Sequence, residues 1–547
     1  MGKITRYIDQ LINRIIPNGS AQTRARHQVS LPYPSTTLPV PSPSLSTRPG
    51  SLIPTYSRSL INHARRWTGK KSTNRGRCTS FAFLPNNCWL TRYDVGLVDL
   101  LPDDVLLAIF DFCAELEAWQ TLVHVCRRWR IVVFESPRRL NLQLVCSAKT
   151  PARKTLDIWP ALPLVTLSDI DHPIENMDNI VAVLERSNRV RQIDLLGVSS
   201  LHLANGLAAM QVPFPELTHL MLSSNEETVP VFPDSFLGGS APRLRIVYFG
   251  GIPFPGLPKL LLSATHLVYL SLFDIPHSGY FPPEAMVTAL SMLISLESLS
   301  LEFQSPRSLP DRRSRHSPSP TRFVLPVLTD FEFKGASEYL DDLMARIDAP
   351  QLIKLYITFF NQIIFDTPQF IQFISRTPRL KAPQKARVTF EGDAASINLS
   401  SHTSSFQWLY VRIPCKELDW QVSSLEQVCT LCLPPLSMLE DPYISEYQYS
   451  LPDWQDNIEN TLWLELLLPF HSVKNLYLSE EFARRIVPTL QELIGGRSTE
   501  VLPTLQNIFL EEIQSSGPIQ EGIERFLATR QLTSHPITVS RWNRWSS

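Results

Sequence analysis

Cysteine is scarce in this chain, and long apolar runs are missing. Eight cysteines at irregular spacings over 547 residues do not form a disulfide framework, so the composition favours a reducing compartment. The longest apolar stretches, such as the one at 464–470, fall far short of the ~20 residues that cross a bilayer. We therefore expect no transmembrane segment and a location in the cytoplasm, the nucleus or both.

Acidic residues are almost missing from the start of the chain. Residues 1–93 carry 14 Lys or Arg and a single acid, Asp9, although the formal net charge of the whole chain is only −1. The remainder therefore holds 37 basic and 51 acidic residues. Because such a body repels phosphate backbones, we expect no nucleic acid among its partners.

Signatures of catalysis and of metal binding are also missing. The sequence has no Gly-x-Ser-x-Gly elbow and no His-Glu-x-x-His helix, and "TGKKST" at 68–73 has Ala64 and Lys71 where a phosphate-binding loop needs Gly and Ser or Thr. Cys429 and Cys432 have metal-ligand spacing, but a tetrahedral zinc needs two further ligands. We favour two buried cysteines, and we expect no catalytic residue, metal or cofactor.

The segment 1–96 is rich in Ser, Thr, Pro and Arg, and we predict that it is a disordered extension. Its one ordered part is a predicted amphipathic helix at 3–16, which Pro17 ends. A basic helix of this kind suits a mitochondrial presequence or a membrane-surface helix. A fraying helix without a role is the alternative.

From about residue 160 a strand pattern dominates the sequence. The template apolar-x-x-apolar-x-apolar begins at residues 190, 217, 244, 267, 296, 328, 352, 473 and 505. Helix-like stretches, for example 282–294 and 480–494, lie between several of these matches. Strand-helix units of 23–32 residues are typical of a leucine-rich-repeat solenoid, in which each unit buries its apolar side on its neighbour. We therefore predict an α/β fold with an irregular solenoid over 160–530; amphipathic strands of an ordinary α/β sheet are the alternative.

Two parts of this region fit the pattern poorly. The gap from 358 to 472 fits the pattern only loosely, with "LEQVCTL" at 425–431 as a partial match. The Ser-, Pro- and Arg-rich stretch at 305–322 lies between two repeats and is predicted to be a loop insertion. We expect a solvated insertion there, and phosphorylation of its Ser-Pro sites is the alternative.

In a leucine-rich strand, the residues between and after the leucines face the concave side. Aromatic anchors in a polar setting are typical of protein-binding surfaces, although exposed aromatic residues also occur without a function. The rule gives as candidate substrate-binding residues Tyr248, Tyr269, Phe273, Tyr356, Tyr477 and Phe509, beside the acids Asp194, Glu302, Glu332 and Glu511.

The segment 101–130, "LPDDVLLAIFDFCAELEAWQTLVHVCRRWR", predicts two short helices. Pro102 followed by Asp103 and Asp104 is a favourable helix start, since proline needs no donor there and acids suit the helix dipole. Apolar residues then recur at helical spacing in both halves of the segment. A unit of about 40 residues seldom folds alone, so either the repeats or a separate protein must cover its remaining apolar face.

These residues resemble an F-box, the module that docks substrate receptors on the Skp adaptor of cullin–RING ubiquitin ligases. Leu-Pro, Ile-Phe and Val-Cys-Arg-Arg-Trp all fall in place, and the resemblance predicts an F-box at 97–145. The adaptor-binding residues that the resemblance implies are Leu101, Pro102, Leu106, Ile109, Phe110, Leu122, Val125, Cys126 and Trp129. An F-box followed by irregular leucine-rich repeats is also similar to the layout of F-box proteins from mushroom-forming fungi.

The resemblance implies a non-enzymatic substrate-recognition subunit of a Skp–cullin–F-box ubiquitin ligase. Its partners would be a Skp-type adaptor, through it a cullin, and a target protein held by the repeats. The alternative is a protein-binding scaffold without a ligase role, in which the F-box-like helices pack internally.

Overall fold

A computed structural model describes residues 101–543, apart from 113–117, 138, 168–176, 227, 306–321, 361–364, 381–382, 401–408, 434–435, 437, 448, 453–457, 493–500, 512–517 and 533–535. The predicted extension at 1–96, its helix at 3–16 and all but the two end residues of the predicted loop at 305–322 lie outside the described residues. The chain divides into two compact units, one that ends at Gln143 and one that begins at Leu144.

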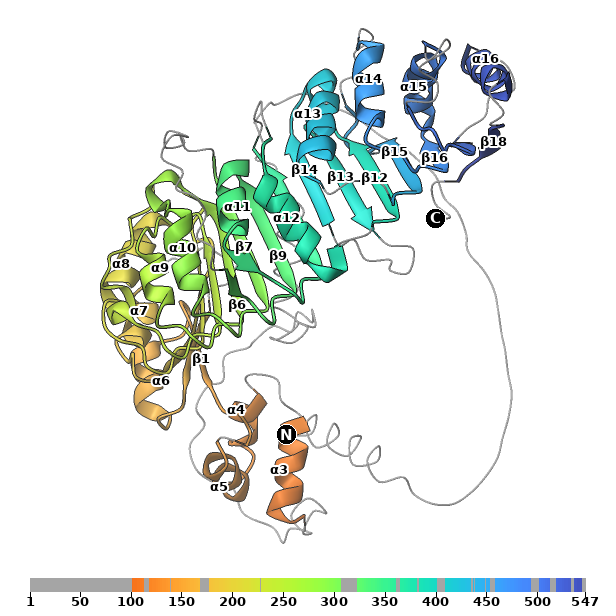
Figure 1. The fold of residues 1–547 in the computed structure, drawn as a ribbon. Helices are drawn as coiled ribbons and strands as arrows, with labels where there is room; N and C mark the ends of the chain where they lie inside the picture. The colour runs from red at the N-terminus through yellow and green to blue at the C-terminus, as the bar shows by residue number, and fades with distance from the viewer. Residues whose placement is uncertain are drawn as a thin grey trace, which may run out of the picture. The chain divides into compact units, whose positions relative to one another are not determined.

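The first unit is a small group of helices, labelled α3 to α5 in Figure 1. Helix α3 spans Asp103–Phe112, α4 spans Ala118–Leu122 and α5 spans Arg127–Glu135. Both α3 and α4 pack on α5. The predicted start of the first helix is confirmed, because α3 begins directly after Pro102 with the two acids in its first turn.

The second unit is built on one long sheet. In the described part of the chain, sixteen strands pair in the order β1-β2-β3-β4-β5-β6-β7-β9-β11-β14-β13-β12-β15-β16-β17-β18. The bounds from β1 to β9 are Leu144–Ser147, Leu164–Leu167, Val190–Leu195, His219–Ser223, Ile246–Gly250, Tyr269–Ile275, Ser298–Phe303, Phe323–Val324 and Asp330–Gly335. Those from β10 to β18 are Ile347–Asp348, Lys354–Phe359, Lys385–Phe390, Ala394–Ser400, Leu409–Pro414, Asp441–Glu446, Asn475–Leu478, Asn507–Leu510 and Thr538–Arg541. The short strands β8 and β10 pair with each other outside this sheet.

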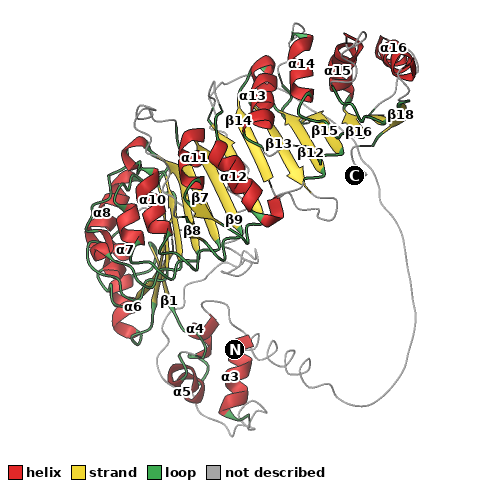
Figure 2. Cartoon of the chain, in the orientation of Figure 1, coloured by secondary structure: helices red, strands yellow, loops and turns green. Residues whose placement is uncertain are grey.

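Helices line one face of the sheet, as Figure 2 shows. We call the opposite face the helix-free face. The helices α6 to α11 span Ala152–Ile158, Asp178–Leu184, Ser200–Ala209, Leu257–Leu261, Pro283–Leu290 and Ser337–Met344. The helices α12 to α16 span Pro368–Arg376, Leu418–Leu431, Asn460–Leu467, Glu480–Glu492 and Pro518–Leu532. Short 3₁₀ turns span His277–Gly279 and Pro378–Leu380, and a kinked turn with positive φ at Leu237 and Gly238 spans Phe236–Gly239.

The leucines of the repeated pattern form the core between sheet and helices. In β4, for example, Leu220 and Leu222 are fully buried, while the alternating residues His219, Met221 and Ser223 are partly exposed. The same alternation recurs in β9, β11, β14, β16 and β17, because successive side chains of a strand point to opposite faces. Strands β7, β13 and β15 are buried over most of their length. All nine predicted pattern matches contain a strand of the sheet, so the predicted repeat fold is confirmed. The strands also begin earlier than expected, at Leu144.

The poorly fitting gap holds an antiparallel insertion in an otherwise parallel sheet. Strand β13 is antiparallel to both β12 and β14, while β14 is parallel to β11 and β15 is parallel to β12. The chain therefore passes from β11 to β12, returns through β13 to β14 beside β11, and then crosses by α13 to β15. We call β12–β14 the meander. The partial match at 425–431 is wrong as a strand, because these residues belong to helix α13.

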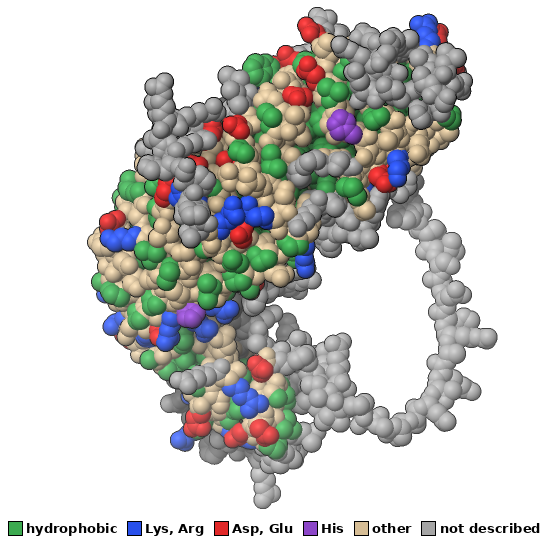
Figure 3. Space-filling model, in the orientation of Figure 1, with side chains coloured by type: hydrophobic (Ala, Val, Ile, Leu, Met, Phe, Trp, Pro, Cys, Tyr) green, Lys and Arg blue, Asp and Glu red, His purple; other side chains and the backbone are tan. Residues whose placement is uncertain are grey.

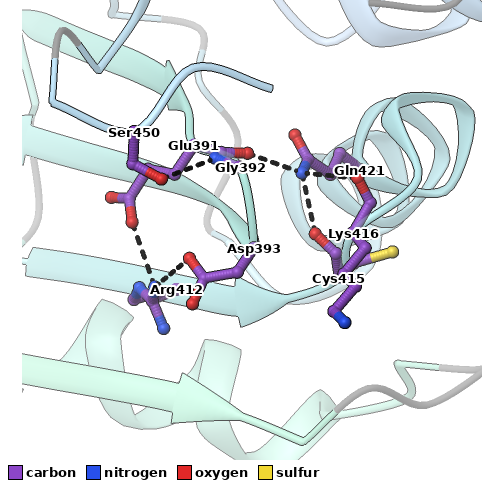
Figure 4. A network of polar contacts seen from close by, with 8 residues as sticks. All are labelled: Glu391, Gly392, Asp393, Arg412, Cys415, Lys416, Gln421 and Ser450. Atoms are coloured by element: carbon purple, nitrogen blue, oxygen red, sulfur yellow. Dashed lines mark hydrogen bonds and ion pairs between the residues drawn. The ribbon is translucent and has the colours of Figure 1, made fainter. Parts of the chain in front are cut away.

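A polar network, drawn in Figure 4, holds the turn between β12 and β13. Arg412 on β14 forms ion pairs with Glu391 at 3.0 Å and Asp393 at 3.1 Å. Gln421 on α13 is fully buried, and its Nε2 donates to the carbonyl oxygens of Glu391 at 2.8 Å and Cys415 at 2.7 Å. The network thus joins the turn, β14 and the crossover helix.

The surface of the repeat region in Figure 3 mixes apolar, acidic and basic side chains. Within the described ranges, none of the helices has the length and apolar character needed to span a membrane.

Candidate protein-binding surfaces

The helical unit has a small core of its own. The rings of Phe110 and Trp129 lie 4.8 Å apart between α3 and α5, and Leu106 and Val133 are also buried. Trp119 adds a second aromatic contact with Phe134. Because burying an aromatic side chain stabilises a fold by several kcal/mol, these rings hold the three short helices together.

Polar contacts connect the ends of the two main helices. The Arg128 guanidinium on α5 donates to the Asp103 carboxylate at 2.7 Å and to the carbonyl of Leu101, which fixes the start of α3. Cys126 caps α5, since its Sγ accepts the N–H of Trp129 at 3.4 Å. The Arg-Arg-Trp run is therefore part of the unit's internal structure as well as its surface.

Apolar side chains remain on the outside of this unit. Val105 is 38% exposed, Val125 is 37% exposed and Ile131 is 45% exposed. Pro102 is exposed and Ile109, one helical turn after Val105, is partly exposed. Val105 and Ile109 thus share one side of α3, opposite the buried core residues.

The nine residues assigned to adaptor binding therefore separate into two groups. Leu106, Phe110 and Trp129 are at most 4% exposed, and the rings of Phe110 and Trp129 pack on each other in the unit's core; their adaptor contact stays a prediction. Helical spacing alone could not separate Phe110 from Ile109, because both are apolar and adjacent in the sequence. The other six are partly or fully exposed, and their adaptor contact stays a prediction: Leu101, Pro102, Ile109, Leu122, Val125 and Cys126.

The helix-free face carries a continuous row of side chains, one from each strand that the sheet contains from β3 to β18. Strand register places these residues opposite one another across the sheet. We call them the central row: Asp194, Met221, Tyr248, Ser271, Ser300, Glu332, Tyr356, Tyr410, Asn398, Arg387, Tyr443, Tyr477, Phe509 and Ser540.

The structure brings the predicted aromatic residues to this face. Tyr248, Tyr356, Tyr477 and Phe509 belong to the central row, and all four are partly exposed. Tyr269 precedes Ser271 by two residues, and Phe273 follows it by two, so both also lie on this face. Their role in binding a target stays a prediction.

Aromatic rings stack along the carboxyl-terminal part of the row. The ring centroids of Tyr443 and Tyr477 are 4.1 Å apart, and those of Tyr477 and Phe509 are 4.5 Å apart. Trp542 lies 5.6 Å from both tyrosines, and the Arg387 guanidinium stands 5.7 Å from the Tyr443 centroid, a cation–π distance. Part of this aromatic stack faces solvent, since Tyr477 and Phe509 are partly exposed.

A hydrogen-bonded ladder runs beside the aromatic stack. Asn475 donates to the Asp441 carboxylate at 2.8 Å, Asn507 donates to Asn475 at 2.7 Å, and the Thr538 hydroxyl donates to Asn507. Sequence reasoning missed this ladder, together with Tyr443 and Trp542. The available signal was the asparagine at the third position of both "VKNLYL" and "LQNIFL".

Carboxyl groups gather on the amino-terminal half of the helix-free face. Burial and the nearby charge of Glu332 raise the pKa of Glu302 to about 8, although Lys334 opposes this shift. Burial also raises the pKa of Asp194 to about 7, and its Oδ1 has no hydrogen-bond partner among the described residues. Lys334 pairs with Asp274 at 3.3 Å. The predicted acids Asp194, Glu302 and Glu332 therefore reach this face, and burial raises the pKa of all three.

Cys429 and Cys432, the pair with metal-ligand spacing, are both buried around the end of helix α13. Burial raises the pKa of both thiols, that of Cys432 to about 12. Within the described ranges, no three His, Cys, Asp or Glu side chains are grouped so that they could hold a metal ion.

Comparison with known proteins identifies the helical unit. Residues 98–143 match the F-box-like family. Among solved structures, the chain is similar to the leucine-rich-repeat-containing protein LegL7 from Legionella pneumophila, with 11% identity, 70% of this chain and 97% of that chain covered, and a TM-score of 0.24. No curated protein matches the chain. The chain therefore carries an F-box-like domain at residues 98–143, followed by a repeat region with a long, mainly parallel sheet.

Proposed function

We propose that this protein is the substrate-recognition subunit of a Skp–cullin–F-box ubiquitin ligase. The F-box-like domain docks on a Skp-type adaptor, and the helix-free face of the repeat region binds a target protein. The chain contributes no catalytic group. It accelerates ubiquitin transfer by proximity, because it holds a target lysine near the charged ubiquitin carrier.

The observation that carries this proposal is the F-box-like match over a unit with uncovered apolar side chains. Val105 and Ile109 lie on the outside of α3, and Pro102 is exposed directly before it, while Phe110 and Trp129 fill the core. A set of exposed apolar residues held on a rigid helix is what a helix-docking partner buries.

Adaptor binding by the full-length chain tests the proposal. We expect Ile109→Glu and Val125→Glu to weaken binding of a purified Skp-type adaptor at least about tenfold, since each buries an unpaired charge in the interface. Asp111→Lys is the matched control, because this exposed residue lies on another side of α3. Circular dichroism melts establish that all three variants fold. Adaptor binding that Ile109→Glu and Val125→Glu leave intact would overturn the proposal.

A second candidate function is a protein-binding scaffold without a ligase role. The burial of Leu106, Phe110 and Trp129 within the helical unit favours it, because these residues then serve folding rather than docking. In that case the full-length protein would bind no adaptor at micromolar concentrations, while the folded repeat region would still capture its target.

The aromatic part of the central row is the proposed target-binding surface. Aromatic side chains on a rigid support lose little conformational entropy on binding, which makes them effective anchors. We propose as contact residues Tyr248, Tyr356, Tyr477 and Phe509 of the row, together with Tyr269 and Phe273, which lie on the same face beside it.

A further inference from the structure

A groove of about 680 Å³ runs along the amino ends of strands β4 to β9, at the edge of the sheet rather than on its helix-free face. The residues that precede successive strands line it. They are Thr218, Arg243, Arg245, His266, Val268, Ile294, Ser295, Glu297 and Val327.

Backbone hydrogen bonds set the spacing of these residues. The N–H of Arg245 donates to the Thr218 carbonyl, that of Val268 to Arg245, and that of Glu297 to Val268, each at 2.8 Å. These bonds extend the parallel ladder by one residue beyond the strand starts. Since neighbouring strands lie ~4.8 Å apart, the backbones of Arg245 and Glu297 are roughly 10 Å apart across Val268.

The groove presents one uncompensated charge of each sign. Among the described residues, the exposed Arg245 guanidinium takes part in no hydrogen bond or ion pair, and neither does the exposed Glu297 carboxylate. The charge of Arg243 is offset by its ion pair with Glu216. Burial and the charges of Arg191 and Arg245 lower the pKa of His219 to about 4, so this neighbour stays neutral at pH 7.

Apolar side chains lie between and beside these two charges. Val268 separates Arg245 from Glu297 along the ladder. Ile294 is 61% exposed and Val327 is 41% exposed on the rim. A ligand that satisfies the whole groove therefore needs an anion, an aliphatic part and a cation in that order.

We propose that this groove binds an extended peptide segment of a protein partner, with an acidic side chain at Arg245, an aliphatic residue over Val268 and a basic side chain at Glu297. A polyproline II peptide rises ~3.1 Å per residue with three residues per turn, so positions i and i+3 share one side at ~9 Å. This spacing matches the separation of roughly 10 Å between the backbones of Arg245 and Glu297. The site rests on the protein-binding role of the repeat region and does not depend on adaptor docking.

Synthetic peptides test the site on the full-length protein. The probe contains the core Glu-Pro-Leu-Lys, and the comparison peptides contain Lys-Pro-Leu-Lys and Gln-Pro-Leu-Gln, each with a fluorescent label for polarisation measurements. We expect Glu-Pro-Leu-Lys to bind about tenfold more tightly than Lys-Pro-Leu-Lys, because the latter places a like charge on Arg245. Arg245→Glu should invert this preference.

Arg153→Glu is the matched control, because Arg153 is an exposed arginine on α6 outside the groove. It should leave all three affinities unchanged. Equal affinities for the three peptides, or a preference that Arg245→Glu does not alter, would overturn the site. Adaptor binding measured on the same samples separates the two proposals, since groove variants should leave it intact.

Discussion

Asp194 shows how the helix-free face constrains a single residue. Its carboxyl lies in the central row with one oxygen buried and without a hydrogen-bond partner among the described residues. Burial raises its pKa from the ordinary 3.8 to about 7. Between these two pH values the folded chain keeps a proton that the unfolded chain releases, so stability falls as pH rises from about 4 to about 7.

We therefore predict that Asp194→Asn stabilises the protein at pH 8 and has little effect at pH 4. The expected difference at pH 8 is about 1–3 kcal/mol, since a pKa shift of one unit corresponds to ~1.4 kcal/mol and partial exposure reduces it. Thermal melts of both proteins at several pH values measure it. Other titrating groups cancel in the comparison, so a difference independent of pH would contradict the assignment.

The face on which a side chain lies could be predicted from the sequence for strands, but not for helix α3. Alternation along a strand placed Tyr248, Tyr356 and Tyr477 on the correct face, because side chains of a strand can only point to one side or the other. In helix α3 the apolar stripe is wide, and Ile109 and Phe110 both fit it. Only packing against α5 decides which of the two is buried.

At the scale of elements, the meander is where the sequence pattern fails. Strands β12 and β14 alternate between buried and less buried residues, and residues 406–411, which overlap β14, even fit the apolar-x-x-apolar-x-apolar template. The template does not encode the reversed direction of β13. The partial match at 425–431 arose because Leu425 and Val428 are three residues apart, a spacing that helices and leucine-rich strands share. The reversal itself depends on tertiary pairing, which no local periodicity encodes.

Gln421 is predicted to be the residue on which the meander turn depends most. Gln421→Leu leaves the carbonyls of Glu391 and Cys415 without their donor, at a cost of about 1–3 kcal/mol per buried group. We expect faster amide hydrogen exchange around Gly392 and a lower melting temperature. Gln506→Leu is the control, because this side chain is exposed. Unchanged exchange at the turn in Gln421→Leu would contradict this role.

At the scale of the whole molecule, the sheet is a one-dimensional series in which each strand contacts its neighbours. The free energy of unfolding of such an array is a sum of terms for each unit and for each interface between units. A substitution that destabilises one unit therefore destabilises its neighbours most. The meander connects the strands β1–β11 to the strands β15–β18. It is therefore the connection through which the carboxyl-terminal strands are stabilised.

Two substitutions that shorten a core side chain should destabilise different parts of the sheet. Leu399→Ala in β13 and Leu220→Ala in β4 each remove a fully buried side chain and cost about 2–5 kcal/mol. We expect Leu399→Ala to accelerate amide exchange mainly in β12–β18, and Leu220→Ala mainly in β1–β6. Exchange mapped by mass spectrometry would contradict this prediction if both variants loosened the whole sheet equally.

The reversed strand β13 also limits how a chain of this kind can change in length over evolution. From β1 to β11 all strands of the sheet run the same way, so the gain or loss of one strand-helix unit shifts the rest by one position and preserves every pairing direction. In the meander, removal of a single strand would reverse the direction in which the next strand runs along the sheet. Strands there can be gained or lost only in pairs.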